Sequence, residues 1–103
     1  MIQVRIEKEN AKYKKIKIIG HAMYDDYGKD IVCAGVSSVI ITSVNAILTF
    51  NKNYLIYSNK EDLFTIKVLE HNDIVDNILL NMVNMLVEIE NNYPKNIKIR
   101  KEN

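Results

Sequence analysis

Apolar residues recur along the chain with either the period of a strand or the period of a helix, and the order of these segments limits the fold more than any other feature. Seven segments show either the alternation of a half-buried strand or the three-and-four spacing of an amphipathic helix. In chain order they are strands at 2–7 and 15–18, a helix at 30–50, strands at 54–58 and 63–68, a helix from 72 or 73 to Pro94, and a strand at 97–99. This ββαββαβ order predicts a two-layer α+β fold, with two amphipathic helices on a largely antiparallel sheet.

The spacing of the apolar residues also predicts which side of each helix faces the sheet. In the first helix the predicted inward residues are Val36, Ile40, Ser43, Ile47 and Phe50, with Val39 and Ala46 beside them. In the second helix they are Ile74, Ile78, Met82, Met85, Leu86 and Ile89. Both stripes would close one core between the helices and the sheet.

Length and charge narrow the class of protein. A chain of 103 residues, 48% of them hydrophobic, is long enough for one compact core and too short for two, so we expect a single domain over 1–103. The formal net charge is +1, the pI is near 7.8, and the lysines are scattered along the sequence. Because nucleic-acid binding requires clustered cations, we predict no direct contact with nucleic acid.

Cysteine content and hydropathy predict a compartment. A single cysteine, Cys33, cannot form a disulfide within the chain, and nothing resembling a signal peptide precedes Glu7 and Lys8. Polar residues interrupt the apolar window at 31–50, so we do not expect that window to span a membrane. These features predict a soluble protein of the reducing cytoplasm.

The segment from Gly20 to Ser38 carries the most reactive side chains. It holds His21, one of two histidines, and Cys33, the only cysteine, on either side of a loop that contains Gly28. The histidine follows a strand and the cysteine begins a helix, so two separate elements can bring an imidazole next to a thiol. A thiol at a helix N-terminus with a histidine beside it is the arrangement of a nucleophile and its base.

Cys33 needs help to act as a nucleophile at neutral pH. An ordinary thiol has a pKa near 8.5, and a helix N-terminus contributes about 0.3–1 kcal/mol, which lowers that pKa by roughly one unit at most. A protonated His21 would supply the larger stabilisation of the thiolate. Asp30 would either accept from the first-turn amides as the helix N-cap or orient His21. Ser37, one turn after Cys33, would hydrogen-bond the thiolate, the histidine or a substrate carbonyl, or bond back to its own helix.

These residues also have plainer explanations. A lone cysteine in an apolar helix is commonly a small buried hydrophobe, and a histidine after a strand is commonly structural. A metal site built from His21, Asp30, Cys33 and the distant His71 has no recognised ligand spacing. We therefore predict no metal and no cofactor.

The sequence GHA at 20–22, followed after a glycine-containing loop by GKDIVCAGVS at 28–37, resembles the signature of the Prp family, the bacterial ribosomal-processing cysteine proteases. The resemblance extends over essentially the whole chain, including the YPKNIKI ending at 93–99. It implies a cysteine protease whose catalytic dyad is His21 and Cys33. The accompanying positions that it implies are Asp30 and Ser37 as supporting residues and Gly20 and Gly28 as hinges of the loop. One mild departure is Gly35, where the family often has alanine.

The same resemblance implies a substrate and an assembly state. Members of the family remove an N-terminal extension from the precursor of large-subunit ribosomal protein number twenty-seven, after a short aromatic-containing motif, and form homodimers. Tyr24 and Tyr27 in the loop would cover the aromatic side chains of such a substrate. The residues themselves leave two alternatives open. One is a non-catalytic ribosome-assembly or protein-binding module, and the other is a thiol-dependent acyltransferase or amidase that uses the same pair.

Overall fold

The structure, a computed structural model, describes residues 1–20 and 31–102. Its elements are β1 (Ile2–Glu9), β2 (Lys12–Ile19), α1 (Ile31–Phe50), β3 (Leu55–Lys60), β4 (Leu63–Val68), α2 (Asp73–Asn92) and β5 (Ile97–Glu102). The predicted α+β class and ββαββαβ order are confirmed. The predictions that involve His21, Gly28 and Asp30 concern residues outside the described ranges.

The five strands form one sheet in the order β3-β4-β2-β1-β5. Each hairpin pairs antiparallel within itself, β2 joins the hairpins by pairing antiparallel with β4, and β5 pairs parallel with β1. The last strand can be parallel because α2 carries the chain back across the sheet before β5 begins. Strand β2 is therefore interior, and it delivers Gly20 at its end.

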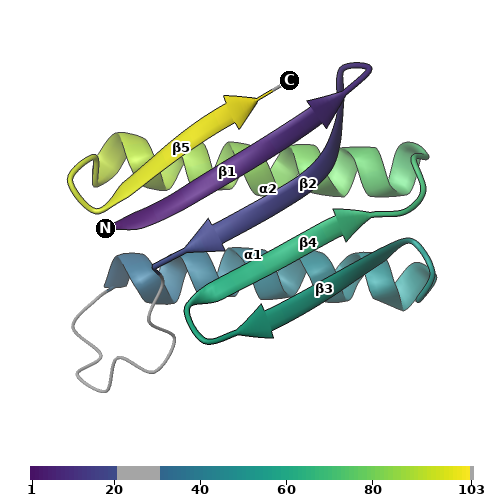
Figure 1. Ribbon diagram of the computed structural model, residues 1–103, viewed down its shortest axis with the longest axis horizontal. Coiled ribbons are helices and arrows are strands. Elements are labelled where there is room, and N and C mark those ends of the chain that lie inside the picture. Colours follow the sequence, from purple (N-terminus) through teal and green to yellow (C-terminus); the bar gives the residue numbers. More distant parts are fainter. Residues whose placement is uncertain (21–30, 103) are drawn as a thin grey trace.

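Both helices cover the same face of the sheet, as Figure 1 shows. Buried residues of all five strands and both helices form one hydrophobic cluster in this layer. Val36, Ile40, Ser43 and Ile47 of α1 are buried as predicted. Phe50 is 62% exposed, and Val44 is buried instead. Phe50 is the last residue of α1, where the chain leaves the helix at Asn51 to turn toward β3.

The buried stripe of α2 differs from the predicted one. Its buried residues are Val75, Leu79, Met82, Val83 and Leu86. Of these, Met82 and Leu86 were predicted to face inward. Met85 is 41% exposed, and the remaining predicted positions, Ile74, Ile78 and Ile89, are half-buried. Because α2 contacts α1 as well as β2 and β5, its most buried side points between the sheet and α1 rather than squarely at the sheet. Spacing along one helix cannot show where a second helix lies.

Helix α1 is also long and apolar enough to cross a membrane, judged by length and composition alone, with a mean hydropathy of 2.1. The polar residues of α1 do not lower its mean hydropathy below the level of a membrane-spanning helix. Core helices of soluble proteins pass the same test, and the residues of α1 that the structure buries belong to the hydrophobic core shared with the sheet and α2.

Candidate active site

Cys33 lies in the first turn of α1, as the third helical residue. It is 5% exposed and belongs to the hydrophobic cluster, between the buried Val32 and Val36. The first four amide groups of an α-helix have no acceptor inside the helix, so Cys33 lies where backbone N–H groups are available to an anion. Burial of the thiol agrees with its alternative interpretation as a core residue, so position and burial alone do not decide its role.

Ser37 lies one turn after Cys33 and is half-buried. Residues four apart on a helix share a face, so Ser37 and Cys33 lie on the same side of α1. The first turn of α1 has no acidic residue among the residues that the structure describes. The predicted carboxylate partner at this end, Asp30, is outside them.

Gly20 directly follows β2 and has a conformation that suits glycine. Its φ is +78°, and a Cβ at this position would lie 2.8 Å from the carbonyl oxygen of Met1. Its N–H donates to the carbonyl oxygen of Asp62, in the turn between β3 and β4, at 3.0 Å. Gly20 therefore holds a fixed point of the fold immediately before His21, and its role as a hinge stays a prediction.

The candidate residues that the structure describes lie at one end of the molecule. The end of β2 and the start of α1 are at the same end of the long axis, whereas α2 begins at the other end (Figure 1). His71 directly precedes the N-cap of α2, so it lies far along this axis from Cys33. This placement gives no support to a site shared by His71 and Cys33. Within residues 1–20 and 31–102, no group of three or more His, Cys, Asp or Glu residues could hold a metal ion.

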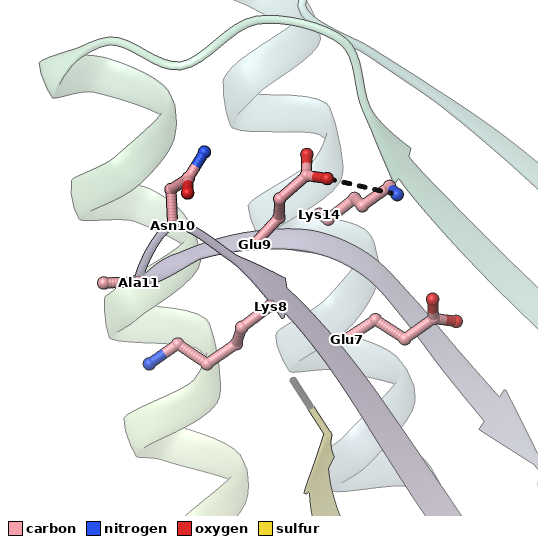
Figure 2. Close-up of a pocket in the computed structure, with 6 residues that line it drawn as sticks. All are labelled: Glu7, Lys8, Glu9, Asn10, Ala11 and Lys14. Atoms are coloured by element: carbon pink, nitrogen blue, oxygen red, sulfur yellow. Dashed lines mark ion pairs between the residues drawn. The ribbon is translucent and has the colours of Figure 1, made fainter.

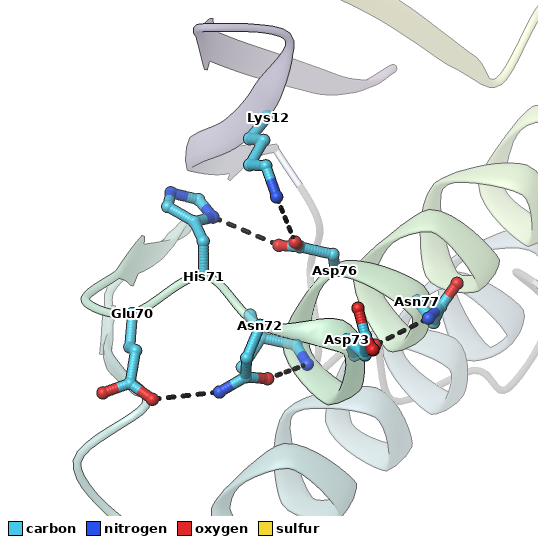
Figure 3. A network of polar contacts seen from close by, with 8 residues as sticks. Lys12, Glu70, His71, Asn72, Asp73, Asp76 and Asn77 are labelled. Atoms are coloured by element: carbon cyan, nitrogen blue, oxygen red, sulfur yellow. Dashed lines mark hydrogen bonds and ion pairs between the residues drawn. The ribbon is translucent and has the colours of Figure 1, made fainter.

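His71 belongs to a polar network that joins the β1–β2 hairpin to α2 (Figure 3). The two oxygens of Asp76 contact His71 Nδ1 at 3.2 Å and Lys12 Nζ at 2.7 Å. Asn72 caps the helix by accepting from the Val75 N–H at 2.9 Å, which confirms the predicted start of α2. Burial raises the pKa of Asp76, but the hydrogen bonds from Lys12 and His71 outweigh it and hold the pKa below its usual range. The network therefore has a structural role in fixing the start of α2.

A hollow at the tip of the β1–β2 hairpin has a volume of about 460 Å³ and lies away from Cys33. Figure 2 shows its lining, in which Glu9 and Lys14 form an ion pair at 3.7 Å. The lining residues are Glu7, Lys8, Glu9, Asn10, Ala11 and Lys14. None of these six carries a thiol or an imidazole, so the hollow lacks the nucleophile and base that the sequence predicts.

The contacts that hold Gly20 and the start of α1 in place were not predictable from the sequence pattern. A Cβ on Gly35 would lie 3.7 Å from Cδ1 of Ile89, so the first turns of α1 pack against the last turns of α2. Asp62 and Met1, which fix Gly20, come from segments that carried no signal for a site. Gly20 and Gly35 were the only visible clues, because glycine often marks a close approach of another segment.

The comparisons with known proteins identify the family. The family described as "Cysteine protease Prp" matches residues 1–98. The chain belongs to this family. A relative named "Ribosomal processing cysteine protease Prp" from Staphylococcus aureus is 38% identical, over 96% of this chain and 97% of its own length. The family resemblance of residues 20–37 is thereby confirmed, and the protein is a cysteine protease rather than only a binding module.

Two solved structures of the Prp protease from S. aureus share the fold. One is a complex with a covalently linked product peptide; it is 34% identical to this chain, with a TM-score of 0.89, and covers 99% of this chain and 100% of its own. The other is a complex with a substrate peptide; it is 33% identical, with a TM-score of 0.88 and the same coverage. At this similarity the two-layer α+β architecture is that of the Prp proteases.

Proposed function

We propose that this protein removes the N-terminal extension of large-subunit ribosomal protein number twenty-seven, with Cys33 as the nucleophile and His21 as its acid and base. The observation that carries the assignment of the nucleophile is that Cys33 is the only cysteine of a chain that belongs to a cysteine protease family. The choice of substrate is supported by the name of the S. aureus relative, which is a ribosomal processing protease.

The assignment of His21 is supported by elimination. The chain has two histidines. His71 contacts Asp76 and lies at the opposite end of the long axis from the start of α1. His21 directly follows Gly20 in the sequence, and Gly20 lies at the same end of the molecule as the start of α1. We therefore assign the catalytic role to His21 rather than to His71.

The proposed reaction is acyl transfer through the sulfur. The Cys33 thiolate attacks the scissile carbonyl carbon, and the carbonyl oxygen becomes an oxyanion that backbone N–H groups at the start of α1 can stabilise. The C–N bond then breaks, the amine leaves with a proton from the His21 imidazolium, and a thioester remains. Water, losing a proton to His21, hydrolyses the thioester and returns the thiol. Asp30 would orient His21 or cap α1, and Ser37 would hydrogen-bond the site from the next turn.

Product masses test this proposal. The protein is incubated with the extended ribosomal protein of its own host, and we expect a truncated protein and a short leader peptide. Cys33→Ala and His21→Ala are expected to abolish cleavage, while His71→Ala, the matched control, retains it. Cleavage by the Cys33→Ala variant, or equal losses in the two histidine variants, would refute the assigned dyad. A transfer product in place of two hydrolysis products would indicate an acyltransferase.

Alkylation of Cys33 tests the pairing with His21 without a substrate. Because Cys33 is only 5% exposed, the informative quantity is the pH at which the rate of iodoacetamide alkylation rises, rather than the rate itself. We expect the rise below pH 7 in the unmodified protein and near pH 8.5 in His21→Ala. An identical profile in both would show that His21 does not stabilise the thiolate.

We further infer a cytoplasmic homodimer, which the family resemblance supports. An apolar hollow of about 250 Å³ on α1 and the β3–β4 hairpin offers one surface for association. Its apolar and aromatic lining residues are Ile41, Val44, Tyr57 and Phe64. Light scattering during gel filtration measures the assembly state, and Ile41→Glu is expected to shift it toward the monomer if this surface is used.

A further inference from the structure

Among the residues that the structure describes, no helix covers the face of the sheet opposite α1 and α2, which we call the open face. Figure 1 shows both helices on one side, so the strand residues that alternate with the buried ones point away from the core. The pairing of β1 with β2 is regular up to a bulge between Glu7 and Lys8, so residues beyond the bulge are left out. The residues of the open face are then Gln3, Arg5, Glu7, Lys15, Lys17, Ile19, Ile56, Ser58, Lys60, Leu63, Thr65, Lys67, Lys98, Arg100 and Glu102. None of these fifteen is aromatic.

The strand register arranges these residues in rows across the sheet. The central row is Arg100, Arg5, Lys17, Thr65 and Ser58, in the spatial order β5-β1-β2-β4-β3. The row toward Gly20 is Lys98, Gln3, Ile19, Leu63 and Lys60. The row toward the hairpin tip is Glu102, Glu7, Lys15, Lys67 and Ile56.

Charge on this face is far from balanced. The three rows hold seven cations and two carboxylates, whereas the whole chain has 14 Lys and Arg against 13 Asp and Glu. Both carboxylates lie in the row toward the hairpin tip. The other two rows contain five cations and no carboxylate. Scattered positions in the sequence thus become one basic surface once the strands are in register.

The centre of this surface places like charges side by side. Arg5 has Arg100 as its register partner on β5 and Lys17 on β2. Strands are about 4.8 Å apart, so the three cations span roughly 10 Å, and such neighbours destabilise a sheet when nothing neutralises them. The ion pairs among the described residues involve Lys12, Lys14 and His71, not these three. An anionic partner would relieve this repulsion.

We propose that the open face of the sheet binds the phosphate backbone of RNA. A regular array of Arg and Lys matches a chain of phosphates, since guanidinium groups bind phosphate oxygens with paired hydrogen bonds. The absence of aromatic residues from the fifteen open-face positions excludes base stacking as the main contact, so the binding reads the backbone rather than the sequence. This inference rests on the sheet register and is independent of the proposed protease substrate.

Other occupants fit this face less well. A second copy in a two-fold dimer would set this surface against itself, cation against cation. The centre of this face holds three cations, Arg5, Lys17 and Arg100. The centres of protein–protein interfaces are instead depleted of charged residues and enriched in aromatic ones, so a protein partner fits less well. The apolar residues of the face lie outside the central row, with Ile19 and Leu63 in the row toward Gly20 and Ile56 in the row toward the hairpin tip. From the net charge and the scattered lysines, the sequence predicted no nucleic-acid binding. That prediction could not take into account that strand pairing brings the cations of distant segments together on one face.

Fluorescence anisotropy with a labelled short RNA duplex, over a range of salt concentrations, tests the proposal. The test variant is Arg5→Gln/Lys17→Gln/Arg100→Gln. The control, Lys52→Gln/Lys95→Gln/Lys101→Gln, removes the same charge from exposed positions outside the open face. We expect the test variant to weaken binding about tenfold or more and to reduce the salt slope by about 2–3, because each neutralised phosphate contributes about 0.7–0.9 to that slope. The control is expected to bind almost as well as the unmodified protein.

Several results would overturn the proposal. These are no RNA binding by the unmodified protein at low salt, equal losses in the two variants, and binding only of an acidic peptide or of anionic lipid vesicles. If the triple variant fails to fold, Lys98→Gln/Arg100→Gln changes two side chains of the edge strand alone and replaces it. Peptide cleavage is measured in parallel, so loss of RNA binding with cleavage retained assigns the effect to the face and not to the protease site.

Discussion

The backbone N–H of Gly20 donates a hydrogen bond of 3.0 Å to the carbonyl oxygen of Asp62, which ties the last residue before His21 to the turn between β3 and β4. The carbonyl oxygen of Met1 approaches Gly20 from another side, leaving no room for a side chain. Three segments distant in sequence thus meet where the chain leaves β2 toward the proposed dyad. These contacts fix Gly20, the residue that precedes His21 in the sequence.

Replacing Gly20 by alanine is expected to lower both stability and activity. Alanine at a φ of +78° costs about 1–2 kcal/mol, and a Cβ only 2.8 Å from the Met1 carbonyl oxygen adds to this cost because backbone must shift. We expect the free energy of unfolding, measured with urea, to fall by about 2 kcal/mol or more. Peptide cleavage by the folded fraction should also decrease if a displaced Gly20 moves His21. An unchanged unfolding midpoint would contradict this account.

Gly35 offers the same substitution with the opposite expected sign. Its added Cβ would meet Cδ1 of Ile89 at 3.7 Å, which is an ordinary van der Waals contact. Alanine in a helix interior is favoured over glycine by about 1 kcal/mol, so Gly35→Ala should raise the free energy of unfolding by up to about that amount. Urea unfolding of both alanine variants side by side checks the pair. A loss of stability in Gly35→Ala would mean that α1 and α2 pack more tightly than the structure shows.

The periodicity of the sequence predicted the elements well because most of them bury one face. The alternation of Ile2, Val4 and Ile6 located β1, and Pro94 correctly marked the end of α2. The local sequence pattern did not indicate which strands pair with each other. The parallel register of Ile97 against Ile2 depends on where α2 returns the chain, and Met85 was assigned inward because the position of α1 beside α2 could not be known.

The site was predictable to a different degree from the fold. Cys33 stood out as the sole cysteine at a helix start, and its place in the first turn of α1 is as predicted. The supports of Gly20 were not predictable, since Asp62 and Met1 contribute backbone carbonyl groups that any residue type would provide. The basic open face was missed for a similar reason. Arg5 and Arg100 are 95 positions apart in sequence and become neighbours only through β1–β5 pairing.

Asp76 predicts a pH-dependent contribution to stability. Its folded-state pKa is below the usual value, despite burial that raises it, because Lys12 and His71 bond to the carboxylate. The stabilisation is therefore present above the unfolded-state pKa, about 3.9, and is lost as the pH falls through the folded-state pKa. Asp76→Asn should cost up to about 1 kcal/mol at pH 7 and nearly nothing at pH 2. Urea unfolding at both pH values measures the difference, with Glu88→Gln on the same helix as control. A cost that does not change with pH would show that the carboxylate charge is not responsible.

Ala11 is expected to be a point of strain that glycine relieves. Asn10 and Ala11 connect β1 to β2 with φ values of 54° and 65°, which is the two-residue turn in which both residues have positive φ (Figure 2). Glycine adopts this conformation without the steric cost of about 1–2 kcal/mol that a Cβ imposes, although its greater freedom in the unfolded chain offsets up to about 1 kcal/mol. Ala11→Gly should therefore raise the free energy of unfolding by about 0.5–1 kcal/mol. The same exchange at the exposed Ala34 in α1 should lower it by about 1 kcal/mol, because glycine disfavours helix. Thermal unfolding of the two variants gives shifts of opposite direction if the hairpin turn is strained, and shifts in the same downward direction if it is not.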